Sequence, residues 1–143
     1  MKQTSLFFTC VLGLALLMSG CRYEDGPIVS FQSPEDRLVN TWIVVAATDS
    51  DGADDKASYE NWTFTFREDG TADLVYPILS IDVTLDGEWN LLDDKENLQL
   101  LLSDPTGLIN FNEELYITKL TRDELWLEDP DDDDRTIQLE PQL

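Results

Sequence analysis

The chain has 143 residues, with 30 acidic side chains, nine basic ones and no histidine, which gives a formal net charge of −21. One domain with its own hydrophobic core is expected at this length. So large a negative charge repels phosphate backbones and argues against nucleic acid as a partner. The lack of histidine removes the commonest general base and metal ligand, and no glycine-rich phosphate loop is present. We therefore expect a non-catalytic protein without a cofactor.

The first twenty residues have the layout of a secretory signal peptide. Lys2 is the only charged side chain of a basic start, and residues 6–18 form an uncharged, mostly apolar run. This run is shorter than the ~20 residues that a membrane-spanning helix needs. The small residues Ser19 and Gly20 then precede Cys21. We expect cleavage after Gly20, which removes residues 1–20.

The residues at this cleavage point, Leu17-Met18-Ser19-Gly20-Cys21, resemble the lipobox of bacterial lipoproteins, with Met18 where leucine is usual. The resemblance implies that the Cys21 sulfur receives a diacylglycerol before cleavage and that the freed amine is then acylated. Acyl chains would hold the protein on a membrane in spite of its negative charge. Cys10 is removed with the signal peptide, so the mature chain has no internal disulfide.

Residues 21–37 are expected to form an acylated tether that ends in a short helix. Glycine and proline residues argue against regular structure in its first part. Glu24 and Asp25 resemble the export signal that sends lipoproteins of the Bacteroidetes to the outer face of the outer membrane, although a solvated linker explains them equally well. The resemblance implies a lipid-anchored protein of the outer membrane, on its periplasmic or its cell-surface face. Ser33-Pro34-Glu35-Asp36 predicts a helix start, with a capping serine and proline at the first helical position.

From residue 38 onward, the apolar side chains recur with the period of two that is typical of strands. Glu68-Asp69-Gly70-Thr71 predicts a tight hairpin, because glycine permits the positive φ that such turns need. Pro77 predicts the end or the edge of a strand, and Asp86-Gly87 predicts a bulge or a hairpin. The strands are expected at 42–47, 62–66 and 72–76, within 78–92, at 98–102, at 115–120 after a lead-in at 108–111, at 125–127 and at 135–140.

About eight strands with short turns leave no stretch long enough for a crossover helix, so consecutive strands must pair antiparallel. We therefore expect residues 38–143 to form an all-β, up-and-down, eight-stranded barrel, because closure removes the free edges. A two-sheet β-sandwich is the alternative.

Three motifs are similar to those of the lipocalin-like lipoproteins of the Bacteroidetes. They are Leu-Val-Asn-Thr-Trp at 38–42, Thr-Phe-Arg-Glu-Asp-Gly-Thr at 65–71 and Gly-Glu-Trp at 87–89. The resemblance covers residues 38–139 and implies a lipocalin-like barrel. Lipocalins carry Gly-x-Trp on the first strand, where the tryptophan closes the barrel floor; here Asn40 stands in the glycine position and Trp42 carries over. The arginine that packs across this tryptophan in the family would be Arg135.

The barrel interior is the candidate ligand site. Its expected aromatic side chains either pack together as a core or line a hollow for a small apolar or amphipathic ligand. A filled barrel would instead favour a non-catalytic accessory or inhibitor protein that acts through its loops and acidic surface. Trp126 is expected on the outer face. The interior candidates are Trp42, Trp62, Phe64, Phe66 and Trp89.

The acidic run Asp131, Asp132, Asp133 and Asp134 is a weak candidate for a metal site, because calcium prefers several oxygen ligands. The run lacks the spacing of a twelve-residue calcium loop with its closing glutamate. We therefore expect a solvated turn and no bound metal.

Overall fold

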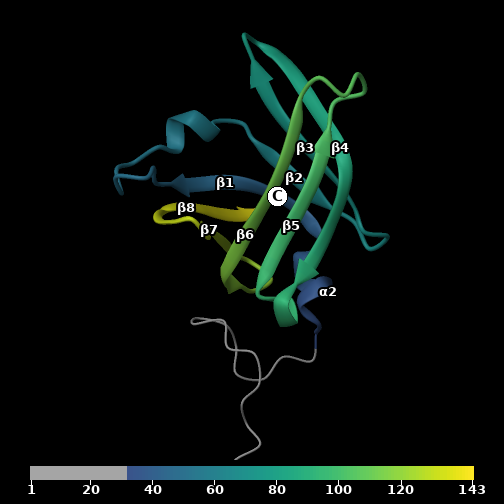
Figure 1. Cartoon of the computed structure of the whole chain (residues 1–143), viewed down its shortest axis with the longest axis vertical. Coiled ribbons are helices and arrows are strands. Elements are labelled where there is room, and N and C mark those ends of the chain that lie inside the picture. Colours follow the sequence, from purple (N-terminus) through teal and green to yellow (C-terminus); the bar gives the residue numbers. More distant parts are fainter. Residues whose placement is uncertain (1–31) are drawn as a thin grey trace, which may run out of the picture.

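The computed structural model describes residues 32–143, apart from the side chains of residues 132–134. Eight strands form a closed antiparallel barrel in which each strand pairs with the next and β8 pairs with β1 (Figure 1). The predicted up-and-down barrel is confirmed and the β-sandwich alternative is wrong. The predicted signal peptide, Cys21 and most of the tether lie outside the described residues. The strands are β1 Asn40–Ala47, β2 Thr63–Phe66, β3 Thr71–Ile78, β4 Ile81–Leu92, β5 Asn97–Ser103, β6 Asn110–Leu120, β7 Leu125–Asp129 and β8 Asp132–Pro141.

Within residues 32–143, three short helices accompany the strands: α2 (Pro34–Leu38), η1 (Lys56–Tyr59) and η2 (Asp93–Lys95). In the part of the chain that the structure describes, no helix is long and apolar enough to span a bilayer. The predicted start of α2 is confirmed. The Asp36 N–H donates to the Ser33 hydroxyl at 3.1 Å, and the Ser33 N–H donates to the Asp36 carboxylate at 3.2 Å.

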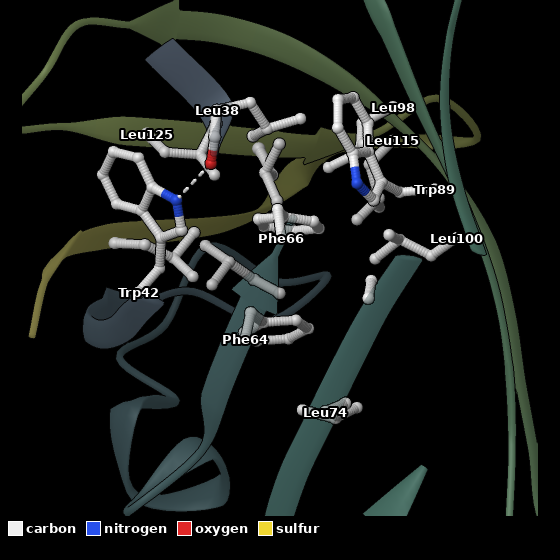
Figure 2. Packing of buried hydrophobic residues seen from close by; sticks show 14 of the residues in the cluster. Leu38, Trp42, Phe64, Phe66, Leu74, Trp89, Leu98, Leu100, Leu115 and Leu125 are labelled. Carbon is white, nitrogen blue, oxygen red and sulfur yellow. Dashed lines mark hydrogen bonds between the residues drawn. The ribbon is translucent and has the colours of Figure 1, made fainter. Parts of the chain in front are cut away.

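Helix α2 closes one end of the barrel. Leu38 at its end is fully buried, and its carbonyl oxygen accepts a hydrogen bond of 2.8 Å from Nε1 of the fully buried Trp42 (Figure 2). The indole N–H is therefore satisfied inside an apolar core. Arg37 also donates to the Leu120 carbonyl at 2.8 Å, which joins the helix to the end of β6. The expectation that Trp42 lies at the barrel floor is confirmed.

Packed side chains fill the interior above this floor. A series of aromatic rings crosses it, with centroids 6.5 Å apart from Phe64 to Phe66 and 6.1 Å apart from Phe66 to Trp89 (Figure 2). Trp89 also donates its Nε1–H to the Arg67 carbonyl at 3.0 Å. Aliphatic side chains from the other strands complete the core: Leu74, Leu85, Leu98, Leu100, Leu102, Leu115, Ile117, Leu120, Leu125, Leu127, Ile137 and Leu139.

The turn between β3 and β4 lies at Leu79-Ser80, where both residues have positive φ. The predicted bulge or hairpin at Asp86-Gly87 is therefore wrong, because β4 runs through it without a register shift. Gly87 is needed for close approach: a Cβ built there would lie 2.0 Å from the Leu101 carbonyl oxygen of β5. A glycine is thus required at this position by the close approach of the β5 backbone and not by a turn.

The hairpin of β3 and β4 extends past the barrel wall. β2 pairs with β3 only as far as Val75, and β5 pairs with β4 only from Asp86 onward. Residues 76–83 therefore form a two-stranded arm, which rises at the top of Figure 1, away from α2. Pro77 lies within β3, on the part of the strand that β2 does not reach, which agrees with the predicted edge position.

The outer face of β3 and β4 brings two carboxylates together. Asp73 and Asp86 lie directly opposite each other, which is unfavourable for like charges. Arg67 offsets this repulsion, because it donates through Nη1 to Asp73 at 2.9 Å and through Nη2 to the second carboxylate oxygen. These hydrogen bonds hold the pKa of Asp73 below its ordinary value. Burial, and then the hydrogen bond with Asp73, raise the pKa of Asp86.

Replacing Arg67 with methionine should destabilise the barrel at pH 7 and have little effect in acid. The lowered pKa of Asp73 stabilises the folded state above the unfolded aspartate pKa of about 3.9, and this contribution is lost as the pH falls through the folded pKa. Urea unfolding of wild type and Arg67→Met measures the effect at both pH values. Arg122→Met, which removes a surface hydrogen bond to Gln32, is the control. If the difference in urea unfolding midpoint between wild type and Arg67→Met did not become smaller in acid, the role of Asp73 would be contradicted.

Candidate functional site

The barrel end opposite α2, which we call the mouth, contains a small cavity of about 50 Å³. Its floor is apolar and consists of Leu115, Leu127 and Ile137. These side chains belong to the same core that fills the rest of the barrel. Sites that enclose a whole small molecule have volumes of roughly 300–1,000 Å³. The cavity can therefore accept one end of a ligand in the conformation described, and not an entire ligand.

Three aromatic side chains form the walls of this cavity: Tyr59, Trp62 and Phe111. The Trp62 ring lies 5.0 Å from the Tyr59 ring and 6.4 Å from the Phe111 ring, in both cases edge to face. Helix η1 positions the first two, since the Trp62 N–H donates to the Tyr59 carbonyl at 3.1 Å. Trp62 thus precedes β2 and turns toward the mouth of the barrel.

Charged side chains surround the opening. Arg135 donates to Asp129 at 3.0 Å, and Glu113 adds a second carboxylate. Hydrogen bonding by Tyr59, together with the charges of Asp129 and Glu113, raises the pKa of Arg135. The mouth therefore combines an apolar floor and aromatic walls with two carboxylates and one guanidinium.

The expectation that Arg135 packs across Trp42 is wrong. Arg135 lies at the mouth with Asp129, whereas Trp42 lies at the closed end under Leu38. The two ends of β8 explain the difference. Arg135 stands near the beginning of the strand, and Trp42 pairs with Pro141 at its end.

Of the five predicted interior aromatic residues, only Trp62 lines the cavity. Trp42, Phe64, Phe66 and Trp89 are buried in the core instead. Their positions agree with the first of the two interpretations, in which the aromatic residues pack together. Trp126 lies on the outer face as predicted, where it is half-buried. The Lys119 ammonium lies 4.4 Å from its ring centroid.

Sequence reasoning missed Tyr59, Phe111 and Glu113. Phe111 and Glu113 alternate with exposed residues along β6, so the period of two would have revealed them had the strand been extended toward its start. Tyr59 lies in a polar loop, where no pattern distinguishes a ring that points inward from one that points to solvent.

A second hollow, an open groove of about 550 Å³, lies outside the barrel beside α2. Val39, Trp89 and Leu91 supply its apolar part, and four carboxylates surround it. These belong to Glu35, Asp36, Glu68 and Asp69. Lys95 bonds to Glu35 and holds the pKa of that carboxyl below its ordinary value. The groove is thus broad and open to solvent, and its rim carries mainly negative charge.

The turn between β7 and β8 consists of Pro130 and Asp131. The predicted turn at 131–134 is therefore wrong beyond Asp131, because Asp132, Asp133 and Asp134 begin β8. Asp131 is exposed, and its N–H donates to the Asp129 carboxylate at 2.9 Å. The side chains of Asp132, Asp133 and Asp134 lie outside the described part. Among the described residues, no three histidine, cysteine or acidic side chains gather as a metal site would require. The expectation that this acidic run binds no metal stays a prediction.

Comparisons with known proteins identify the fold. No protein-family model matches the chain, and no curated protein matches it. Among solved structures, the chain is similar to a lipocalin-like protein from Bacteroides uniformis, with a TM-score of 0.59 and 14% sequence identity over 74% of this chain and 99% of that chain. The fold is thus a lipocalin-like barrel. At this identity the likeness shows the fold alone, so the function must be argued from the mouth.

Replacing Arg135 with methionine should lower the free energy of unfolding by about 1 kcal/mol, a value discounted for the exposure of the guanidinium. Without the Arg135 guanidinium, the Asp129 carboxylate has lost its cationic partner and lies beside an apolar cavity, where it is 17% exposed. Urea unfolding measures the change. The double variant Arg135→Met, Asp129→Asn should be more stable than Arg135→Met alone, and no such recovery would contradict the pairing.

Proposed function

We propose that the protein is a non-catalytic lipoprotein of the cell envelope whose lipocalin-like barrel binds a small apolar or amphipathic molecule at its open mouth. The cavity between Tyr59, Trp62 and Phe111 carries this proposal, because it is where the packed interior stops and aromatic surface meets solvent. Aromatic walls with a few convergent polar groups are typical of small-molecule sites.

The size of the cavity decides how such a ligand would lie. The aromatic core excludes a molecule from the centre of the barrel, unlike a hollow barrel that encloses its ligand. One end of the ligand enters the mouth, and the remainder lies over the rim. Trp62 and Tyr59 belong to the segment around η1, so movement of that short segment is the simplest way to enlarge the opening.

The proposed anchor is consistent with the position of the mouth. The described chain enters at Gln32 beside α2, the closed end of the barrel. A tether from Cys21 to this point reaches at most about 40 Å when fully extended. An acylated Cys21 in the outer membrane would therefore keep the closed end within about 40 Å of the bilayer, on the periplasmic or the cell-surface face.

A second candidate function is an accessory or inhibitor protein without an internal ligand. The packed aromatic interior supports this alternative, because a filled barrel leaves no room for an internal ligand. The exposed apolar arm supports it as well, because Leu79 at its tip is 94% exposed. Exposed aliphatic groups of this kind are frequent in interaction surfaces. Binding of small molecules at the mouth separates the two functions, since a purely protein-binding module would show none.

The anchor predicts incorporation of fatty acid at one position. Cells that express the wild type and are fed an alkyne analogue of palmitate should yield labelled protein, and Cys21→Ser should abolish the label. Cys10→Ser is the matched control, because Cys10 is expected to leave with the signal peptide. Equal labelling of wild type and Cys21→Ser would contradict acylation at Cys21.

Binding at the mouth is tested with the full-length Cys21→Ser chain, which carries no acyl group, and the neutral fluorescent probe N-phenyl-1-naphthylamine. We expect saturable binding that Trp62→Leu weakens about tenfold, because loss of one aromatic wall removes apolar contact worth roughly 1.4 kcal/mol. Trp126→Leu, on the outer face, should leave it unchanged. Absence of binding, or equal binding by the Trp62→Leu chain, would contradict the proposal.

A further inference from the structure

The arm of residues 76–83 has one continuous apolar face. Tyr76 pairs with Val83, and Ile78 pairs with Ile81, so all four side chains point to the same side of the hairpin. Tyr76 and Val83 pack against the barrel core. Ile78 and Ile81 continue this face beyond the barrel, where they are 41% and 70% exposed.

This apolar face is continuous with the mouth cavity. The Tyr76 ring lies 5.0 Å from the Trp62 ring, and Trp62 is a wall of the cavity. An apolar path therefore runs from the mouth over Trp62 and Tyr76 to Ile81 and the tip residue Leu79. Such a path is long and narrow, which suits a single extended alkyl chain better than a compact ring system.

The chemistry of the mouth favours a cationic group. Aromatic rings that surround a small space bind quaternary ammonium groups through cation–π attraction. Glu113 and Asp129 lie at this cavity with Arg135, so their formal charges sum to −1. Arg135 is engaged by Asp129 and by a hydrogen bond with Tyr59. The charge of Glu113 also acts on this guanidinium, so a cationic head would share Tyr59 and Glu113 with it. The whole chain, at −21, adds a field that attracts cations and repels anions.

We propose that the mouth and the arm form one site for a single-chain amphiphile with a quaternary ammonium head. The head lies between Tyr59, Trp62 and Phe111 and faces Glu113, and the alkyl chain lies along the apolar face of the arm. This inference rests on the proposed function of the mouth and names the class of ligand that it takes.

Three amphiphiles with the same tail and different heads test the choice of head. Isothermal titration calorimetry compares dodecyltrimethylammonium, dodecyl maltoside and dodecyl sulfate below their micelle concentrations, with the full-length Cys21→Ser chain at about 0.15 M salt, where long-range charge effects are screened. We expect dodecyltrimethylammonium to bind about tenfold more tightly than the maltoside, and the sulfate to bind most weakly. Butyltrimethylammonium should bind more weakly than its dodecyl homologue, because it lacks the contacts with the arm.

Matched variants locate the two halves of the site. Glu113→Gln should weaken binding of dodecyltrimethylammonium and leave the maltoside unchanged, whereas Glu88→Gln, which removes an exposed carboxylate on the outer face, should change neither. Leu79→Ser should weaken the dodecyl ligand and leave butyltrimethylammonium unchanged. Leu101→Ser is its control, because Leu101 is also exposed but lies on the outer face of β5.

The possible results are distinguishable. Equal affinity for the three heads, or equal effects of Glu113→Gln and Glu88→Gln, would overturn the cationic site and leave the mouth as an apolar binding site. Equal effects of Leu79→Ser and Leu101→Ser would overturn the placement of the alkyl chain on the arm. Failure of all three dodecyl amphiphiles, together with failure of the neutral probe, would overturn the proposed function itself.

Discussion

The hydrogen-bonded pairing of β1 with β8 closes the barrel, and the rest of the structure depends on it. It joins the first strand to the last, so neither is left with an open edge. Closure also fixes the volume that the inward side chains must fill. One register shift, between Val44 and Ala46, lets Trp42 and Ala47 both face inward although they are five positions apart. Strand β1 can then supply buried side chains both at the closed end and in the wall above it.

The side chains packed inside the closed barrel stabilise it. The predicted mature chain has no disulfide, so its stability must come from the buried aromatic and aliphatic side chains. These side chains occupy the centre of the barrel, so a ligand could bind only at its ends. At one end α2 covers the core, while at the other the core ends at Trp62 and Phe111. The packed interior thus acts as a scaffold, and the two hollows of the described residues lie at its ends, the cavity at the mouth and the groove beside α2.

The sequence was sufficient to predict the barrel because its signals are local. Alternating apolar residues and the capping box of α2 depend on neighbours only a few positions away. The sequence-based predictions were wrong where the structure of a residue depends on backbone that is distant in the sequence. Gly87 carries a turn-like sequence but is required by the approach of β5, and the real turn at Leu79-Ser80 contains no glycine or asparagine to announce it. Likewise, the placement of Arg135 follows from the direction of β8 in the closed barrel, which no local pattern contains.

The arm has a further consequence for association between molecules. A two-residue turn with positive φ at both positions makes Ile78 and Ile81 a hydrogen-bonded pair, so the backbone groups of the next pair, Pro77 and Asp82, point outward. Proline has no N–H to offer a foreign strand, and Asp82 places a negative charge beside the opposite edge. The arm can thus expose aliphatic side chains to solvent while its backbone resists the edge-to-edge pairing that leads to aggregation.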